Sequence, residues 1–545
     1  MLEGKANLKT LDLIRETAGN IMDSADCAIG YEAAHMVLTG MDGFMKDYRH
    51  HIEHGKCSCH ITQPVSCVAL CPAGVDIPGY IALVKEKRYA DAVKLIRKDN
   101  PFPTACALIC EHPCEARCRR NMIDSSINIR GLKRMAVDNA RANTVPVPEK
   151  AQGTGKRIAI VGGGPGGLSA AYYLELMGHH AVVFEEKSKL GGMLRYGIPS
   201  YRFPRERLQE DIDAILSTGV EVRLNTRIGN EEGEIPFEKL REEFDAVHVA
   251  IGAHTDKKIG IEGEDSKGVM SAVEMLRSIG DENMPDFKDK TVVVVGGGNV
   301  AMDCTRSAIR LGAKKVGIAY RRRQDDMTAL PEEVEGAVAE GAELYALKAP
   351  HKIEADENGN VAALWVEPQI IGPIDAWGRA RPIQADVPLL RIPCDIVVVA
   401  IGQGIETRHF QEAGLSVKRG TFSAMSDSEI KDVPGVFAGG DCVTGPATVI
   451  RAIASGKVAA ANIDEYLGYH HVVPCDVEIP PVSYEDKEPC GRIQLSEKEA
   501  GDRKKNFDAF ECGMTEQEAC QEAGRCLRCD KYGYGSLKGG RAAIW

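Results

Sequence analysis

Cysteine is the residue type whose spacing most directly suggests chemistry in this sequence. Of 18 cysteines, eight lie from Cys57 to Cys118 and six lie from Cys475 to Cys529. In a reducing compartment, such clusters indicate metal ligands rather than a disulfide framework. Three cysteines elsewhere lie in or beside strand and helix patterns and are interpreted as small buried hydrophobic residues: Cys304, Cys394 and Cys442.

The spacing within the first group is regular. Cys67 and Cys71 are separated by three residues, and the same interval separates four further cysteines: Cys106, Cys110, Cys114 and Cys118. Residues four apart share one face of a helix, but Pro113 forces this run to bend. A bent backbone that directs thiolates inward suits a cubane cluster, and four thiolates also suit zinc. Spacing alone leaves both metals open.

A glycine-rich loop follows the apolar stretch RIAIV. Gly162, Gly164 and Gly167 fit the pattern G-x-G-x-x-G at the junction of a predicted strand and a predicted helix. Bare glycine backbone lets a pyrophosphate approach the N-terminus of such a helix. Glu185 ends the next predicted strand, 21 residues after Gly164. A carboxylate at this place holds ribose hydroxyls, so the loop predicts a dinucleotide site.

A second copy of the pattern begins 134 residues later, in TVVVVGGGNVA. Its small residues are Gly296, Gly298 and Ala301, and no acid follows at the corresponding place. Three arginines stand there instead: Arg321, Arg322 and Arg323. Guanidinium groups suit a 2′-phosphate, which favours NADP over NAD. The alternative is that these arginines form a solvated or salt-bridged face.

Two dinucleotide sites in one chain indicate a flavoprotein reductase, with flavin in one site and nicotinamide in the other. Gly440 and Asp441 follow a short apolar strand and precede a long helix. We expect Asp441 to bind a ribityl hydroxyl of the flavin, and Thr448, at the start of the helix, to face the flavin ring. The alternative is that this segment is another strand–helix unit without a ligand.

No cysteine pair accompanies the flavin motifs. A disulfide mechanism needs such a pair beside the flavin ring, so electrons are expected to leave by another route. Zinc has no redox chemistry, whereas iron–sulfur clusters accept single electrons. The cysteines are therefore interpreted as iron–sulfur ligands, with structural zinc as the alternative.

The predicted secondary structure around these residues changes along the chain from helices to alternating strands and helices. An α-helical iron–sulfur domain is predicted before an α/β region of two Rossmann-like domains, with the NADP domain inserted in the FAD domain. The predicted segments are a helical docking segment (1–60), a [4Fe-4S] domain (61–145), a first FAD-binding segment (155–285), an NAD(P)-binding domain (286–395), a second FAD-binding segment (396–470) and a tail with cluster cysteines (471–545).

Composition narrows the class of protein. The net charge is −12 with a pI near 5.7, which argues against nucleic acid or an anionic membrane as the main partner. No apolar run reaches the ~18 residues that a membrane span needs. The first residues are polar and helical in pattern and lack the apolar core of a signal peptide. The expected location is therefore the cytoplasm.

Four stretches resemble the small (beta) chain of glutamate synthase and its relatives, among them the large subunit of ferredoxin-NADP transhydrogenases: GGMLRYGIPSYRFP, GGGNVAMDC, YRRRQDDM and FAGGDCVTGPATVI. The resemblance covers about residues 60–470. It implies that FAD exchanges a hydride with a nicotinamide and single electrons with two [4Fe-4S] clusters, without a catalytic side chain.

The same resemblance implies the site residues. The implied FAD site comprises Gly162, Gly164, Pro165, Gly167, Glu185, Gly192, Gly252, Gly440, Asp441 and Thr448. The implied NADP (or NAD) site comprises Gly296, Gly298, Asn299, Ala301, Arg321 and Arg322.

The cysteine pattern departs from that family, whose members carry a leading C-x2-C that is missing here. Cys526 and Cys529 form a C-x2-C at the other end of the chain, and we expect the tail to fold back and supply both thiolates. One cluster would then be held by Cys67, Cys118, Cys526 and Cys529, and the other by Cys71, Cys110, Cys114 and Cys106. Cys106 is the fourth ligand here because Lys133 stands where some relatives have Glu or Gln.

The first 60 residues resemble the end of the NADH-binding flavin subunit of complex I and of bifurcating hydrogenases. In that family the cysteine matching Cys27 is the fourth ligand of a [4Fe-4S] cluster whose other ligands lie in an upstream C-x2-C-x2-C, which is missing here. Cys27 is therefore either a relic within a helical docking module or part of a third cluster with Cys57 and Cys59.

These observations predict an NADPH-linked flavin and iron–sulfur subunit of a multi-subunit oxidoreductase. The expected partners are complex-I-like flavin and iron–sulfur subunits, with ferredoxin, in an electron-bifurcating NADH/NADPH/ferredoxin transhydrogenase. Alternatives are a glutamate synthase small subunit that feeds the large subunit, and a stand-alone NADPH-dependent reductase of metal ions or dyes. A non-catalytic scaffold is the alternative of a different class, and the two complete phosphate loops argue against it.

Overall fold

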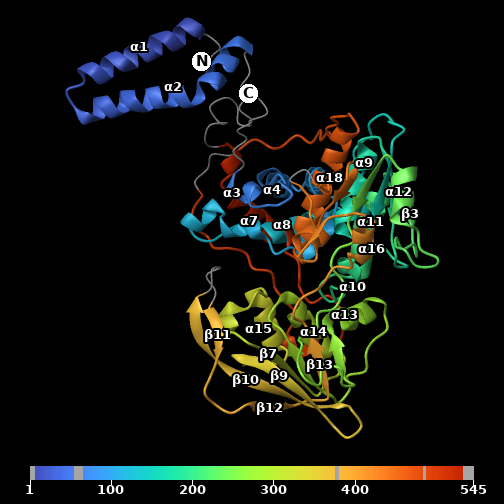
Figure 1. Ribbon diagram of the computed structural model, residues 1–545. Coiled ribbons are helices and arrows are strands. Elements are labelled where there is room, and N and C mark those ends of the chain that lie inside the picture. The colour runs from blue at the N-terminus through green and yellow to red at the C-terminus, as the bar shows by residue number, and fades with distance from the viewer. Residues whose placement is uncertain are drawn as a thin grey trace. The chain divides into compact units, whose positions relative to one another are not determined.

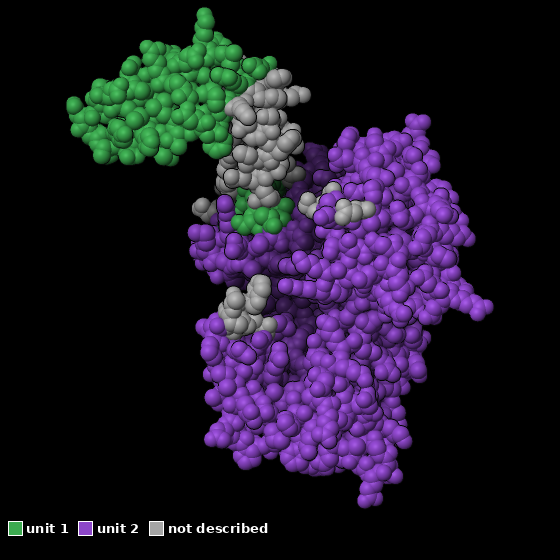
Figure 2. Space-filling view, viewed as in Figure 1, with its two compact units in different colours: residues 1–69, 482–484, 527–545 green, residues 70–481, 485–526 purple. Residues whose placement is uncertain are grey.

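The computed structural model of the chain describes residues 6–54, 65–374, 380–425, 428–431, 433–482 and 487–531. Contacts divide the chain into two compact units, which Figure 2 colours separately. Unit 1 comprises residues 1–69, 482–484 and 527–545, and unit 2 comprises residues 70–481 and 485–526. Each unit is a body of its own, and unit 2 carries both phosphate loops.

Unit 1 is built on a helical hairpin of α1 (Leu8–Ser24) and α2 (Ala28–His54), with the short α3 (Ser66–Ala69) and η4 (Cys529–Lys531) (Figure 1). Asn7 caps α1, because its side chain accepts a hydrogen bond from the Thr10 amide. Leu11 and Met41 are buried between the two helices. Ile29 and Met36 stay exposed, because two helices alone bury only one stripe of each.

The N-terminal region of unit 2 is helical. Its elements are α4 (Ile77–Lys85), α5 (Tyr89–Arg97), α6 (Pro103–Leu108), α7 (Pro113–Ala116), η1 (Arg119–Met122), α8 (Ile129–Asn139) and η2 (Ala142–Thr144). Proline begins α6 and α7. The N–H of a first helical residue makes no hydrogen bond within the helix, so proline, which has no N–H, is tolerated there. The run of cysteines is thereby divided between two short helices and a bend, as Pro113 predicts.

A five-stranded parallel sheet with the order β16-β4-β1-β2-β3 follows. Its strands are β1 (Arg157–Val161), β2 (His180–Phe184), β3 (Glu221–Arg223), β4 (Ala246–Val249) and β16 (Val436–Ala438). The accompanying helices are α9 (Pro165–Leu176), α10 (Met193–Tyr196), α11 (Arg205–Leu216), α12 (Phe237–Glu243), α17 (Asp441–Thr444) and α18 (Val449–Tyr466), and α9 packs along α18. The strands are apolar on both faces because helices cover parallel sheets.

A second five-stranded parallel sheet has the order β5-β13-β6-β7-β8. Its strands are β5 (Val269–Ser271), β6 (Thr291–Val295), β7 (Lys315–Tyr320), β8 (Glu343–Ala346) and β13 (Ile396–Val399), with helices α13 (Ala272–Gly280), α14 (Asn299–Arg310) and α15 (Pro331–Ala339) and the short η3 (Gln324–Asp326). An antiparallel sheet lies beside it, formed by β9 (Lys348–Ala355), β10 (Val361–Ile374), β11 (Ala380–Gln384) and β12 (Leu390–Pro393) (Figure 1).

The second sheet is inserted in the first. The chain leaves the first sheet after β4, builds the whole second sheet, passes through α16 (Arg408–Glu412), β14 (Val417–Lys418) and β15 (Thr421–Phe422), and returns as β16 beside β4. The predicted fold class is therefore confirmed: two Rossmann-like regions, one within the other, follow a helical region. No helix in the described ranges is long and apolar enough to cross a membrane.

The segment after residue 487 packs back onto unit 2 through α19 (Ala500–Arg503) and α20 (Glu516–Gly524). α20 contacts α4 and α8. In the inserted region Glu340 accepts hydrogen bonds from Arg306 and Arg310, both within that region, and from Arg503 of the returning segment at 2.8 Å. The Glu340 side chain is fully buried, so these ion pairs join the tail to the second sheet away from water.

We expect Glu340→Ala to lower the free energy of unfolding by about 3–5 kcal/mol, because the change leaves the buried Arg310 guanidinium without its anion and removes one of two anions from Arg306 and Arg503. Denaturation by urea, followed by circular dichroism, measures the change. The control is Glu412→Ala, because Glu412 pairs with Arg408 at the surface with half of its side chain exposed. That change is expected to cost at most about 1 kcal/mol. Equal losses in the two variants would contradict the role of the buried network.

Candidate functional site

The first phosphate loop joins β1 to α9 with almost no room for side chains. Gly162 has φ +112°, and a Cβ there would lie 2.4 Å from the Ala250 carbonyl oxygen. A Cβ on Gly167 would lie 2.0 Å from the Gly162 carbonyl oxygen. Gly164 precedes the first turn of α9, whose N-terminal amides face away from the helix. The loop therefore offers bare backbone and a helix N-terminus, as binding of a pyrophosphate requires.

Glu185 lies directly after β2. Its carboxylate accepts hydrogen bonds from the Gly163 amide at 2.7 Å and the Lys187 amide at 2.8 Å. Burial raises the pKa of Glu185 above its ordinary value, and the two amides oppose that shift. A carboxylate has about four lone-pair sites. Glu185 thus keeps acceptor sites for ribose hydroxyls.

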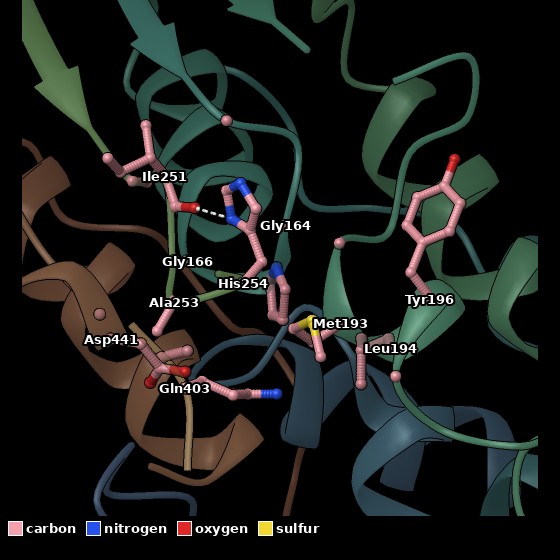
Figure 3. A pocket seen from close by; sticks show the side chains of 18 of the residues that line it. Gly164, Gly166, Met193, Leu194, Tyr196, Ile251, Ala253, His254, Gln403 and Asp441 are labelled. Atoms are coloured by element: carbon pink, nitrogen blue, oxygen red, sulfur yellow. Dashed lines mark hydrogen bonds between the residues drawn. The ribbon is translucent and has the colours of Figure 1, made fainter. Parts of the chain in front are cut away.

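A large cavity opens beside this loop (Figure 3), between the two nucleotide-binding regions. Ten of the predicted site residues line it: Gly162, Gly164, Pro165, Glu185, Gly192, Gly252, Asn299, Gly440, Asp441 and Thr448. Gly192 closes one wall with φ +50°, and a Cβ there would lie 2.8 Å from the Cα of Gly164. These glycines keep the wall thin, which fits a flat dinucleotide cofactor such as FAD.

Asp441 begins α17 on the opposite wall. One carboxylate oxygen accepts a hydrogen bond from the Ala447 amide at 3.1 Å. Burial raises the pKa of Asp441 to about 6. Thr448 precedes α18, so the N-terminus of that helix faces the cavity. The wall thus supplies an acceptor for hydroxyl groups and a helix terminus that favours partial negative charge.

Several side chains of the cavity were not predicted as site residues. Met193, Leu194 and Tyr196 come from α10, inside the stretch GGMLRYG that carries the family resemblance. His254 follows β4, and its Nδ1 lies 3.2 Å from the Ile251 carbonyl oxygen. Gln403 follows β13 of the inserted region. The family resemblance of the stretch around Met193 could have indicated the residues of α10. We found no sequence pattern that indicates His254 or Gln403 as site residues.

The second phosphate loop repeats the geometry of the first. Gly296 has φ +150°, and a Cβ there would lie 2.3 Å from the Ala400 carbonyl oxygen. Gly298 precedes α14, and Ala301 is fully buried in its first turn. Of the predicted residues of this loop, Asn299 alone lines the large cavity beside the first loop, which we call the flavin-side cavity. The second loop thus borders this cavity at Asn299, and the assignment of the two loops to two cofactors stays a prediction.

The three arginines after β7 are not equivalent. Arg323 pairs with Asp326 at 2.9 Å, and Arg322 also has an interaction partner. Arg321 is exposed, and within the described residues it forms no ion pair. The Arg321 guanidinium is thus available to bind the 2′-phosphate that distinguishes NADP from NAD.

Asn299, predicted to bind NADP, has contacts of its own. Its side-chain amide donates to Glu111 Oε1 at 2.9 Å, and its Oδ1 accepts from the Leu330 amide at 2.9 Å. Glu111 and Ile109 both line the flavin-side cavity, and Cys110 lies between them in the chain. The bend that carries Cys110 therefore touches the inserted region and borders the cavity.

Four of the predicted cluster ligands share one region of unit 2. Cys106 and Cys110 are joined by a hydrogen bond that lowers the pKa of Cys110 to about 6 and, with burial, raises the pKa of Cys106 well above its usual range. Burial also raises the pKa of Cys114. Lys133 is buried, and although burial opposes the shift, the thiols of the four cysteines raise its pKa: Cys106, Cys110, Cys71 and Cys114. Four thiols that act on one buried cation are compatible with an anionic tetrathiolate cluster.

The other predicted ligands are divided. Cys118 and Cys526 belong to unit 2, whereas Cys67 and Cys529 belong to unit 1. Their joint cluster stays a prediction. Cys27 is exposed in unit 1, and Cys57 and Cys59 lie outside the described residues.

The returning segment reaches the helical region as far as Cys526. Glu522 accepts from the Asn128 amide at 2.7 Å and from the Ile493 amide at 2.8 Å. Arg525 pairs with Asp124 at 2.9 Å. The segment that precedes Cys526 is thus held against the cysteine-bearing helices of unit 2.

Family models match most of the chain. The pyridine nucleotide-disulphide oxidoreductase model matches residues 156–456. The dihydropyrimidine dehydrogenase domain II, 4Fe-4S cluster model matches residues 44–145, and the NADH-ubiquinone oxidoreductase-F iron-sulfur binding region model matches residues 1–51. The chain belongs to the pyridine nucleotide-disulphide oxidoreductase family and carries two iron–sulfur regions before the reductase region. FAD, NADP and [4Fe-4S] clusters are its cofactors, while the number of clusters stays a prediction.

Similar proteins agree on the class of enzyme. The chain is 38% identical over 516 residues to "NADP(+)-dependent formate dehydrogenase subunit beta" of Moorella thermoacetica, covering 88% of this chain and 72% of the relative. It is 35% identical over 580 residues to "NADPH-Fe(3+) oxidoreductase subunit beta" of Geobacter sulfurreducens, covering 97% and 85%. It is 32% identical over 423 residues to "Glutamate synthase [NADPH] small chain" of Escherichia coli, covering 74% and 88%. The resemblance to the glutamate synthase small chain is confirmed, and the chain is an NADPH-dependent oxidoreductase of this kind.

Among solved structures, FprA of Mycobacterium tuberculosis in complex with NADPH shares the fold. The TM-score is 0.50 at 20% identity, covering 58% of this chain and 85% of that chain. This likeness supports the Rossmann-type fold alone.

The raised pKa of Asp441 predicts opposite effects on stability and on flavin binding. Without flavin, the folded chain takes up the Asp441 proton at a pH of about 6, whereas the unfolded chain does so at about 3.9. Between these values the folded state binds more protons, so stability falls as pH rises through this window and stays lower above it. Asp441→Asn removes that penalty.

We therefore expect Asp441→Asn to raise the melting temperature of the flavin-free protein at pH 7 and to lower its flavin content after expression. Melting curves from pH 5 to 8 and the flavin-to-protein ratio measure the two effects. Asp476→Asn is the control, because it removes the same charge from an exposed residue. If Asp441→Asn kept both its flavin and the pH dependence of its melting temperature, Asp441 would not belong to the flavin site.

Proposed function

We propose that this chain is an NADPH-linked electron-transfer subunit in which FAD and [4Fe-4S] clusters lie in sequence. The observation that supports this most strongly is the position of Cys110, whose two chain neighbours line the flavin-side cavity. Bound FAD would supply hydride exchange with a nicotinamide and one-electron exchange with a cluster. A cluster ligand at the cavity wall gives single electrons a short route.

The residues that border the cavity support this route over a disulfide route. Within the described ranges, no cysteine is among the lining residues. Cys442 is fully buried in α17, and burial raises the pKa of its thiol to about 12. A thiol of this kind is protonated at neutral pH and does not act as a nucleophile.

The chain's own residues have binding and orienting roles in this proposal. The first loop, Glu185 and Asp441 would hold FAD, and the loop at Gly298 with Arg321 would hold NADP(H). Cys71, Cys106, Cys110 and Cys114 would hold one cluster, and Cys67, Cys118, Cys526 and Cys529 the other. The domain boundaries given above belong to the same proposal.

The names of the relatives support a place in a larger complex, because two of them are beta subunits and one is a small chain. We propose that unit 1 docks on a complex-I-like partner, since its first 51 residues match the iron-sulfur binding region of the NADH-ubiquinone oxidoreductase F family. The finer proposal is an electron-bifurcating NADH/NADPH/ferredoxin transhydrogenase. A glutamate synthase small subunit and a stand-alone acceptor reductase are the alternatives.

Anaerobic titration of the purified chain with NADPH tests the route. We expect NADPH to bleach the flavin absorbance and electron paramagnetic resonance signals of reduced clusters to grow. Bleaching without any cluster signal would contradict the route from flavin to cluster. A flavin that neither NADPH nor, in a second titration, NADH reduces would contradict the proposal as a whole.

The same titration on Cys106→Ala tests the fourth ligand of the nearer cluster. We expect this variant to lose bound iron and the corresponding resonance signal, because a tetrathiolate site with three ligands is incomplete. Cys490→Ala is the control, since Cys490 is exposed and is not among the predicted ligands. Unchanged iron in Cys106→Ala would assign the fourth ligand elsewhere.

Arg321→Ala tests the choice of nucleotide. Loss of hydrogen bonds to a charged group costs about 1.5–3 kcal/mol, so we expect the KM for NADPH to rise at least about tenfold while the KM for NADH stays unchanged. Arg323→Ala is the matched control, because Arg323 already pairs with Asp326. Similar effects in both variants, or an equal effect on NADH, would leave Arg321 without a specific role.

A further inference from the structure

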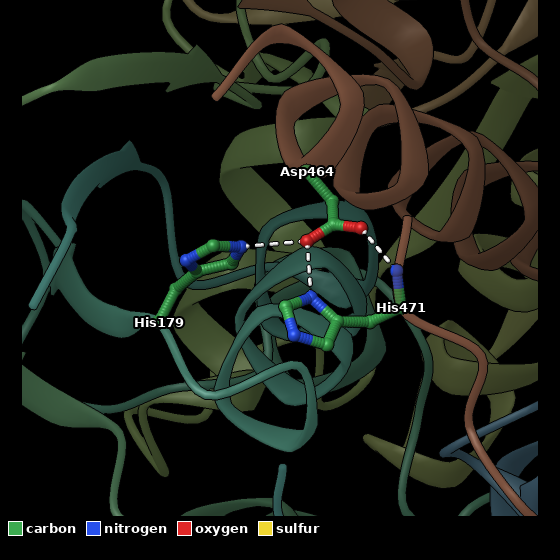
Figure 4. A group of neighbouring side chains, drawn as sticks. All are labelled: His179, Asp464 and His471. Atoms are coloured by element: carbon green, nitrogen blue, oxygen red, sulfur yellow. Dashed lines mark hydrogen bonds and ion pairs between the residues drawn. The ribbon is translucent and has the colours of Figure 1, made fainter. Parts of the chain in front are cut away.

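Three polar side chains from two distant segments of unit 2 meet where the turn before β2 lies beside the end of α18 (Figure 4). His179 lies in the turn between α9 and β2, Asp464 lies on α18, and His471 follows the end of α18. His179 Nε2 lies 2.8 Å and His471 Nδ1 lies 2.7 Å from the same oxygen, Asp464 Oδ1. One ligand atom from each residue lies within 4.8 Å of the other two. Two imidazoles thus converge on one carboxylate.

The carboxylate is buried without a permanent cation. The Asp464 side chain is 3% exposed and that of His179 is fully buried. In the described ranges of the chain, no lysine or arginine pairs with Asp464. A buried carboxylate among neutral groups is unfavourable by several kcal/mol. Hydrogen bonds from the His471 amide and from imidazole N–H groups offset part of this cost, and a bound metal ion would neutralise the carboxylate fully.

The outer contacts allow the histidine tautomer that a metal site needs. The Thr154 hydroxyl lies 2.7 Å from His179 Nδ1 and 3.3 Å from the Gly178 carbonyl oxygen. If the hydroxyl donates to that carbonyl, it accepts from Nδ1–H, and His179 Nε2 then presents a lone pair to Asp464. A lone pair that faces a carboxylate oxygen is repulsive unless a cation lies between them. Metal-bound histidines are usually oriented by such a hydrogen bond from the other ring nitrogen.

The remaining ligands are also oriented. The His471 amide donates to Asp464 Oδ2 at 2.7 Å, which leaves Oδ1 to face the imidazoles. The Tyr469 ring stacks on His471 with centroids 5.3 Å apart and meets the edge of His179 at 5.4 Å. Both imidazole planes are therefore held by a neighbouring aromatic ring.

We propose that His179, Asp464 and His471 bind one Zn²⁺ ion, with water as the fourth ligand. Two imidazole nitrogens and one carboxylate oxygen are a ligand set that zinc accepts, at metal–ligand distances of about 2.0–2.2 Å. The His471 side chain is 25% exposed, which gives water access to the fourth position. Insertion of the ion requires Oδ1 to withdraw from the two nitrogens, which now lie at hydrogen-bonding distance. The ion would fasten the chain after α18 to the turn before β2, independently of the flavin and cluster sites.

The test uses the purified full-length protein with its cofactors. We expect wild type to retain about one Zn²⁺ per chain beyond any adventitious amount, measured by elemental analysis after dialysis. Zinc K-edge X-ray absorption should show nitrogen and oxygen neighbours with no sulfur, which distinguishes this site from zinc held by cysteines. Added Zn²⁺ should raise the melting temperature of a zinc-depleted sample, and Mg²⁺ should not.

Variants assign the site. His471→Ala should abolish the bound zinc and the Zn²⁺-dependent rise in melting temperature, and Thr154→Val should weaken Zn²⁺ binding about 10- to 100-fold through the lost orienting contact. His470→Ala is the matched control, because His470 is the exposed neighbour of His471. His471 lies after α18 and is partly exposed, so its replacement tests the site even if Asp464→Asn fails to fold.

Two results would overturn the proposal. One is wild-type protein without zinc and without a Zn²⁺-dependent shift, which would make the cluster a hydrogen-bond network neutralised by a proton. The other is zinc with sulfur neighbours, or zinc that is equal in His471→Ala and His470→Ala, which would place the ion elsewhere.

Discussion

The pairing of β16 with β4 is the constraint on which the cofactor cavity depends. Val436 lies opposite Val247 in a parallel register, after the chain has completed the whole inserted region. The carboxyl ends of parallel strands meet at one edge of the sheet, where ligands bind in this type of fold. This return therefore brings Asp441 to the edge that already holds the glycine loop after β1. Each wall is incomplete alone, since one supplies bare backbone amides and the other a carboxylate and the start of α18.

The helical region is fastened to this sheet by buried polar contacts. Asp211 on α11 accepts hydrogen bonds from the Thr104 and Ala105 amides at 3.1 and 2.8 Å, which satisfies the first turn of α6. Burial raises the pKa of Asp211 to about 7, and the amides oppose the shift. Lys457 on α18 donates to Asp99 at 2.5 Å. The helix that carries Cys106 is thus positioned by the flavin-side region, which is why the bend at Cys110 borders the cavity.

Local patterns predicted the features of the site that depend on backbone conformation. The glycines at both loops were recognisable because the G-x-G-x-x-G pattern occupies a few consecutive residues, although the carbonyl oxygens that a Cβ at Gly162 or Gly296 would strike belong to the distant Ala250 and Ala400. Side-chain partners were harder to predict. Asn299 lies at the predicted phosphate loop, yet its amide bonds to Glu111 from a distant helical region. The three arginines looked alike in sequence, and only the position of Asp326 distinguishes Arg323 from Arg321.

The sequence by itself determined the two strand–loop–helix units, the nature of their ligands and the presence of thiolate clusters, because each depends on residues that are close in the chain. Tertiary structure alone decided which walls face each other. It placed Ile109 and Glu111 at the flavin-side cavity, and it brought His179 and His471 to one buried carboxylate. The physical reason is that burial and long-range packing set the partners of polar side chains, and neither burial nor packing is encoded in the spacing of neighbouring residues.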